Sequence, residues 1–103
     1  MNDINLGVAA YACSFGNSEK RLDEWCRKFG TSGLRDEIIS LVRKIEEQIM
    51  TDVQNSKRSY EGSELELMVR TACNACDHRI EKEGMAAILD YVAWMCWHEG
   101  YLK

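Results

Sequence analysis

Proline is absent from this 103-residue chain, so helix boundaries must come from glycine and from clusters of small polar residues. The chain also has no apolar run near the roughly 20 residues that a membrane-spanning helix needs. Its first residues, Met-Asn-Asp-Ile-Asn-Leu-Gly, lack the basic and long apolar segments of a secretory signal. These absences predict a cytoplasmic protein without a membrane anchor.

Motifs of common enzyme classes are absent as well. The sequence holds no G-x-S-x-G, P-loop, G-x-G-x-x-G or H-E-x-x-H pattern. A catalytic cysteine–histidine pair needs to be close only in space, but nothing selects either of the two histidines, His78 and His98, for such a pair. The paired acids Glu46 and Glu47 fall on a charged outer face, where solvation is the ordinary explanation. We therefore expect no enzymatic activity.

Cysteine occurs five times, an odd number that does not fit the even count of a secreted disulfide framework. Cys73 and Cys76 have the C-x-x-C spacing of half a zinc site, and Cys96 is a third thiol that could join them. The second C-x-x-C is missing, and on a continuous helix His78 would lie about 200° round from Cys76. We expect reduced cysteines packed as small hydrophobic side chains and no cofactor. A metal- or ligand-binding bundle using these thiols is the alternative.

Positive charge is scarce, because the net charge is −4 and the sequence pI is about 5.2. Binding to nucleic acid then has weak support, from Lys57-Arg58 with Tyr60 and from Arg27-Lys28. A helix-turn-helix could be drawn over residues 18–45. Its recognition helix would carry acids that repel phosphates, namely Asp36, Glu37, Glu46 and Glu47. A nucleic-acid-binding helical domain is therefore a second alternative, and we expect nucleic acid not to be the partner.

Helical periodicity is what the sequence does show. It predicts helices over 4–15, 18–29, 33–55, from about 64 onward, and 85–98. Ile4, Val8, Tyr11, Ala12 and Phe15 share one side of the first, which Gly7 weakens. The apolar stripe of the third is Leu34, Ile38, Leu41, Ile45, Ile49 and Val53. Ser63 and Glu66 match a capping box for the fourth, whose core face extends to Ile80, and Gly84 separates it from the fifth. Since period-2 alternation is nowhere sustained, we expect one all-α domain over 1–103, a compact bundle of four or five helices without a sheet.

The last predicted helix has two apolar faces. One is a core stripe made of Met85, Ile88, Leu89, Val92 and Cys96. The second is made of Ala87, Tyr91, Trp94 and His98 at i, i+4, i+7 and i+11, with Trp97 beside it. A helix on the surface of a small domain needs only one such face. This helix is therefore either sandwiched in the core or in contact with another molecule.

Tyrosine and tryptophan are typical of interface hot spots, because they bury a large area and keep a polar group. We therefore expect a small cytoplasmic protein-interaction module that binds a macromolecular partner, or a second copy of itself, by steric means. Many small regulators and phage- or plasmid-encoded inhibitors share this build. The predicted partner-binding residues are Tyr91, Trp94, Trp97 and His98.

Overall fold

The computed structural model describes residues 3–12 and 18–102, and within these ranges the chain is all-α with no strand. In chain order the elements are α1 (Asp3–Ala12), α2 (Ser18–Phe29), the 3-10 turn η1 (Ser32–Leu34), α3 (Arg35–Ser56), α4 (Gly62–Cys76) and α5 (Lys82–Glu99). This confirms the predicted all-α bundle of four or five helices without a sheet. The end of the first predicted helix, including Phe15, lies outside the described residues. No helix in the described ranges has the length and apolar character needed to span a bilayer.

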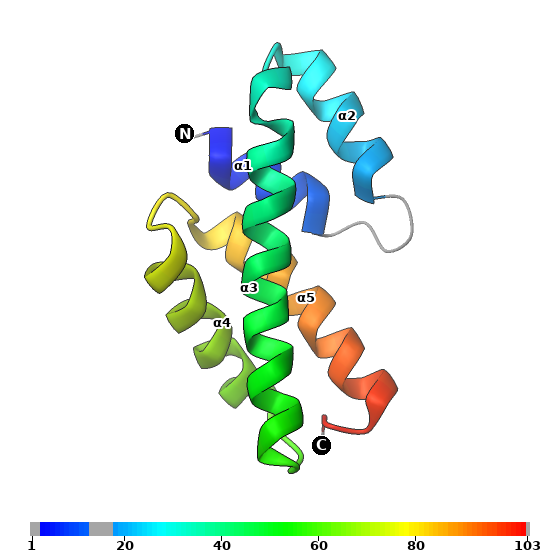
Figure 1. Cartoon of the computed structure of the whole chain (residues 1–103), viewed down its shortest axis with the longest axis vertical. Coiled ribbons are helices and arrows are strands. Elements are labelled where there is room, and N and C mark those ends of the chain that lie inside the picture. The colour runs from blue at the N-terminus through cyan, green and yellow to red at the C-terminus, as the bar shows by residue number, and fades with distance from the viewer. Residues whose placement is uncertain (1–2, 13–17, 103) are drawn as a thin grey trace.

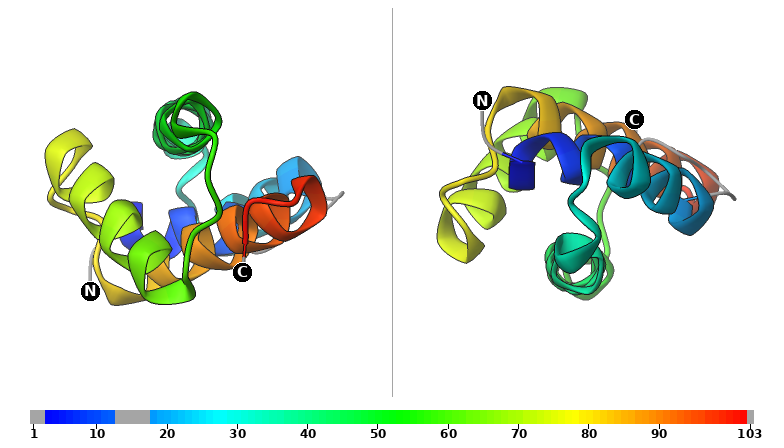
Figure 2. Two further views of the ribbon diagram at one scale, coloured as in Figure 1. Left: turned by 90° about the horizontal axis from the view of Figure 1, so that it is seen from below. Right: turned by 90° about the horizontal axis from the view of Figure 1, so that it is seen from above.

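The long helix α3 lies across a layer formed by the other four helices (Figures 1 and 2). It contacts each of them along its length. The buried residues of α3 are apolar, and most of its charged residues are exposed outside this contact face. Four of its six predicted stripe residues are buried, namely Ile38, Ile45, Ile49 and Val53. Leu34 and Leu41 are only half-buried and lie at the edge of the core.

The shortest helix, α1, lies at the centre of the bundle. It packs mainly on α5 and also contacts α2 and α3. The prediction for its apolar side is confirmed, because Ile4, Val8, Tyr11 and Ala12 are all buried. Its other contacts are made through Asn5 and Gly7, two residues that a simple apolar pattern does not select.

Gly7 is needed because α1 approaches α3 closely. A Cβ atom at this position would lie 2.3 Å from Cδ1 of Ile38 and 3.2 Å from Cζ3 of Trp25. Ile38 is itself fully buried, so its side chain has little room to move away. The glycine that weakens the helix locally therefore allows the helix to pack.

Replacing Gly7 by Ala is expected to lower the free energy of unfolding by about 1 to 2 kcal/mol, because overpacking outweighs the gain in helix propensity. Chemical denaturation measures this. Gly62→Ala is the matched control, since nothing lies within 4 Å of the Cβ it would add. It should leave the protein as stable as the wild type or up to about 1 kcal/mol more stable. Equal stabilisation by both substitutions would contradict the close approach of α1 and α3.

The junctions around α4 differ from the prediction. The capping box is formed by Glu61 and Glu64, in place of Ser63 and Glu66: the side chain of each accepts a hydrogen bond from the backbone N–H of the other. Helix α4 ends at Cys76, so Ile80 is buried from the following turn and not from the helix. Gly84 is not a separator but part of the first turn of α5.

That first turn is capped by a side chain from α1. Oδ1 of Asn5 accepts hydrogen bonds from the backbone N–H of Glu81 at 2.8 Å and of Gly84 at 2.9 Å. Nδ2 of Asn5 donates to Glu83 at 3.4 Å. No side chain of α5's own N-cap residue does this. Because the first N–H groups of a helix have no partner within the helix, Asn5 satisfies donors that would otherwise be buried alone.

The other end of α5 is tied to the α3–α4 connection. Gly100 ends the helix in the left-handed conformation, with φ of 85°. The chain then turns back, so that the backbone N–H of Tyr60 donates to the carbonyl of Tyr101 at 2.6 Å and a single parallel bridge joins Tyr60 to Leu102. Tyr60 is buried and its hydroxyl lies 2.6 Å from Oγ of Ser56. The polar connection is therefore anchored to the C-terminal end of the chain.

Candidate functional site

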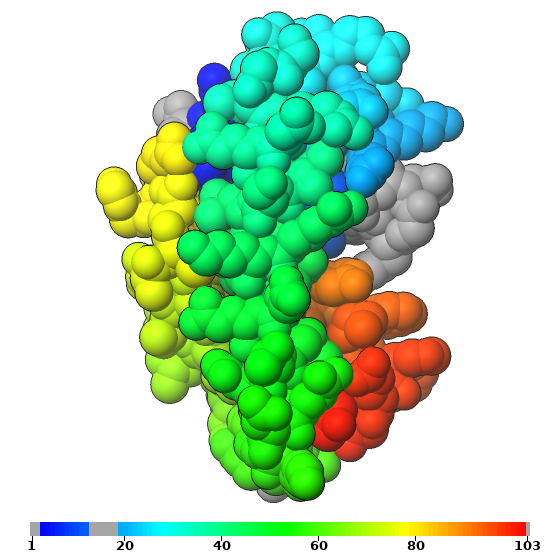
Figure 3. Space-filling model, viewed as in Figure 1, coloured from blue at the N-terminus to red at the C-terminus, as the bar shows by residue number. Residues whose placement is uncertain are grey.

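The second face of α5 is partly in the core and partly at the surface. Ala87 is buried and Tyr91 half-buried, whereas Trp94 is 43% and Trp97 65% exposed. Among the described residues, α1 packs along the first part of α5: Asn5 caps its start, and Tyr11 and Ala12 share a pocket with Tyr91. The first half of this face is thus buried at Ala87, and the C-terminal half is open at Trp94 and Trp97. The C-terminal part of α5, orange to red, lies at the surface in Figure 3.

Three side chains on the open half form a ring-to-ring row, here called the aromatic ladder: Tyr91, Trp94 and His98. The rings of Trp94 and His98 are stacked, with centroids 5.3 Å apart and planes 11° from parallel. The rings of Tyr91 and Trp94 are 6.4 Å apart and tilted by 33°. Trp97 lies beside this row on the helix. Because each ring restricts its neighbour, these residues can meet another surface at low entropic cost.

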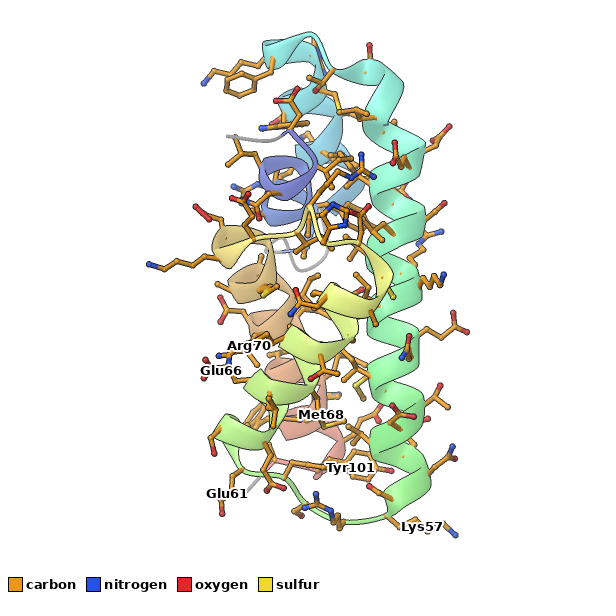
Figure 4. All side chains as sticks on the ribbon, turned by 90° about the vertical axis from the view of Figure 1, so that its left-hand side faces the viewer. Lys57, Glu61, Glu66, Met68, Arg70 and Tyr101 are labelled. Carbon is orange, nitrogen blue, oxygen red and sulfur yellow. The ribbon has the colours of Figure 1, made fainter. Side chains whose placement is uncertain are left out.

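An apolar groove between α4 and α5 adjoins this surface. It has a volume of about 470 Å³ and is lined by Glu66, Val69, Arg70, Lys82, Met85, Ala86 and Leu89. Glu66 and Arg70 extend from α4 on the side away from α3, toward which Met68 is directed (Figure 4), and are ion-paired at 3.1 Å. Met85 and Leu89, predicted as core, are half-buried here. Leu89, Ala93 and Trp97 follow at i, i+4 and i+8, so an apolar strip extends from the groove to Trp97.

A smaller pocket lies on the other side of the ladder, between α1, α3 and α5. Its volume is about 190 Å³, and it is lined by Tyr11, Ala12, Arg43, Glu46 and Tyr91. The expectation that Glu46 is solvated on an outer face is wrong, because its side chain is half-buried. Burial raises the pKa of Glu46 to about 7, since desolvation disfavours the charged carboxylate. Sequence reasoning missed this residue, although its spacing of i+4 from Val42 and i+7 from Ile39, both buried, places it beside the core stripe.

The three thiols of the alternative metal site do not all lie together. Cys73 and Cys96 are buried on different helices, and Cys76, half-buried, donates to Oε1 of Gln48 at 3.8 Å. Burial raises the pKa of Cys73 to about 11 and also raises that of Cys96, so neither thiol readily forms the thiolate that binds metals. His78 lies exposed in the turn after α4. Over residues 3–12 and 18–102, no group of three or more His, Cys, Asp and Glu side chains is placed to hold a metal ion.

One of the two basic residues of the α3–α4 connection interacts with the protein itself. The guanidinium of Arg58 is 2.9 Å from the carboxylate of Glu64 and stacks over the ring of Tyr60 at 3.9 Å. Lys57 ends α3 with a positive φ of 53°. These contacts shape the connection, and they pair the charge of Arg58 with that of Glu64.

Comparisons of this chain with protein-family models, with curated proteins and with solved structures find no match. On its own surface, α5 carries two of the four large hydrophobic side chains that are exposed among the described residues, Trp94 and Trp97.

Proposed function

We propose that this chain is a small cytoplasmic protein-interaction module, which binds a macromolecular partner or its own copy through the C-terminal half of α5. The observation that carries this proposal is the exposure of Trp94 and Trp97 next to the stacked ring of His98. Keeping two tryptophans in water forgoes stabilisation of about 25 cal/mol for each Å² that could be buried. Such patches mark interaction sites on soluble proteins.

The mode of action proposed is steric, as in a small regulator or inhibitor. The helical bundle holds the rings in place, and a partner gains affinity by burying them. The apolar strip from the α4–α5 groove to Trp97 widens the surface beyond the ladder. The free thiols of the four described cysteines fit a reducing cytoplasm.

The metal-binding and nucleic-acid alternatives gain no comparable support. Cys96 lies on a different helix from Cys73 and Cys76, and Arg58 of the basic pair at the α3–α4 connection is ion-paired within the chain. We therefore do not propose either activity.

Trp97→Ala is expected to leave the free energy of unfolding within about 0.5 kcal/mol of the wild-type value, because the side chain is mostly exposed. Binding should fall at least tenfold, as for a hot-spot tryptophan. Sedimentation velocity measures self-association. Affinity capture from the native host, followed by titration of the purified captured protein, measures binding to a partner.

Leu67→Ala is the matched control, because Leu67 on α4 is 58% exposed and lies away from the aromatic ladder. It should bind as the wild type does. A Trp97→Ala protein that keeps every interaction of the wild type would overturn the proposed function.

A further inference from the structure

The small pocket beside the aromatic ladder differs in chemistry from the rest of the proposed binding surface. At about 190 Å³ it is smaller than the roughly 300–1,000 Å³ of sites for drug-sized ligands. It has room for one side chain. Tyr91 belongs both to this pocket and to the ladder, so a partner that covers the ladder also reaches the pocket.

The lining of the pocket holds one carboxylate, that of Glu46, and one guanidinium, that of Arg43. Arg43, which also lines it, lies 3.1 Å from Glu19 of α2 and is engaged there. Over the described residues, no hydrogen bond or ion pair is made by the carboxylate of Glu46, and only desolvation alters its pKa. The other facing groups are the phenols of Tyr11 from α1 and Tyr91 from α5. A partly buried carboxylate that is not paired with a cation has a desolvation cost, and pairing with an incoming cation offsets that cost.

The walls of the pocket also favour a cation. Tyrosine rings attract ammonium and guanidinium groups through their negative faces, by about 0.5 to 2 kcal/mol. Two tyrosines and a carboxylate around a space for one side chain therefore favour a long basic residue over an apolar or acidic one, while Arg43 stays paired with Glu19. The net charge of −4 further favours a basic partner over a second copy of this chain.

Building on the proposed function, we propose that this pocket receives a lysine or arginine side chain of the partner protein, whose cation pairs with Glu46 between Tyr11 and Tyr91. The ladder and Trp97 then supply the apolar contact around this ion pair. The partner is thereby defined as a different protein that presents a basic residue next to an apolar surface.

The test uses n-butylammonium as a probe for the basic side chain and n-butanol as its neutral counterpart, at constant ionic strength. We expect saturable amide shifts in NMR spectra for n-butylammonium at pH 8, centred on the pocket residues. With a pKa of about 7, the Glu46 carboxyl is charged in roughly nine molecules of ten at pH 8 and about one in thirty at pH 5.5. Affinity should thus fall about thirtyfold at pH 5.5, and at least tenfold at pH 8 in Glu46→Gln.

Glu47→Gln, which removes an exposed charge one residue away, should leave binding of the probe unchanged. Equal binding of n-butanol and n-butylammonium, or unchanged binding in Glu46→Gln, would overturn the inference. So would self-association of the wild type that Glu46→Gln abolishes, because the basic side chain would then come from a second copy. If a partner depends on Trp97 but not on Glu46, this inference fails and the proposed function stands; if it depends on neither, the proposed function fails as well.

Discussion

Asn5→Ala is expected to lower the free energy of unfolding by about 3 kcal/mol, although the substitution improves the intrinsic helix propensity of α1. Asn5 is 1% exposed, and its Oδ1 accepts from two backbone N–H groups at the start of α5. Removing the acceptor leaves the N–H groups of Glu81 and Gly84 without a side-chain partner, at about 1 to 3 kcal/mol each. Urea denaturation followed by circular dichroism measures the change.

Asn74→Ala provides the control for this prediction. Asn74 is also an asparagine within a helix, α4, but its side chain is exposed. We expect its replacement to change stability by less than about 0.5 kcal/mol. Similar values for the two variants would show that the contact from α1 contributes nothing to the start of α5.

Glu46→Gln is expected to stabilise the protein, by about 2 to 3 kcal/mol at pH 8. Burial raises the pKa of Glu46 from the ordinary 4.5 to about 7. The folded protein therefore holds a proton that the unfolded chain releases, and each pKa unit corresponds to about 1.4 kcal/mol. The stability associated with the protonated form is fully present below pH 4.5 and is lost as the pH rises through 7. Glutamine resembles the protonated carboxyl but does not titrate, so the variant keeps this stability at pH 8.

The measurement is the difference in free energy of unfolding between variant and wild type at pH 5 and pH 8. Comparing the variant with the wild type cancels the pH dependence of other groups, some of which change stability in the opposite direction. For example, hydrogen bonds from Arg79 lower the pKa of Asp77, so the stabilisation from Asp77 is lost as the pH falls. Glu47→Gln should show a difference near zero at both pH values. If Glu46→Gln gave the same difference at pH 5 and pH 8, Glu46 would not have the raised pKa.

The sequence predicts the helices well, because their apolar residues recur at local spacings. Ile38 and Ile45 are identified by their own neighbours in sequence. Asn5 is not, because its partners are 76 and 79 residues away and no local pattern joins them. In the same way, the boundary between the core and open parts of the second face of α5 depends on which helix covers it. Periodicity indicates that Ala87 and Trp94 share a face but does not show that only Ala87 is covered by the rest of the protein.

The sequence thus predicts which aromatic residues share a face of α5. It does not predict how exposed each of them is. The sequence predicts a solvated Glu46 because this residue stands in a run of charged residues, although it lies one helical turn from the buried Val42. Charge in the sequence indicates solvation on average, whereas packing of α1 and α5 against α3 decides it for each side chain.

Both ends of α5 are fastened to parts of the chain that are remote in sequence, Asn5 at its start and Tyr60 beyond its end. Neither end can therefore fray without also releasing α1 or the α3–α4 connection. We therefore expect α5 to unfold together with these segments as one cooperative unit. The amide protons of α5 should then exchange with similar protection along the helix, without progressive fraying from its ends. The helix that carries the proposed binding surface is held rigid by distant segments, so partners meet a preformed shape.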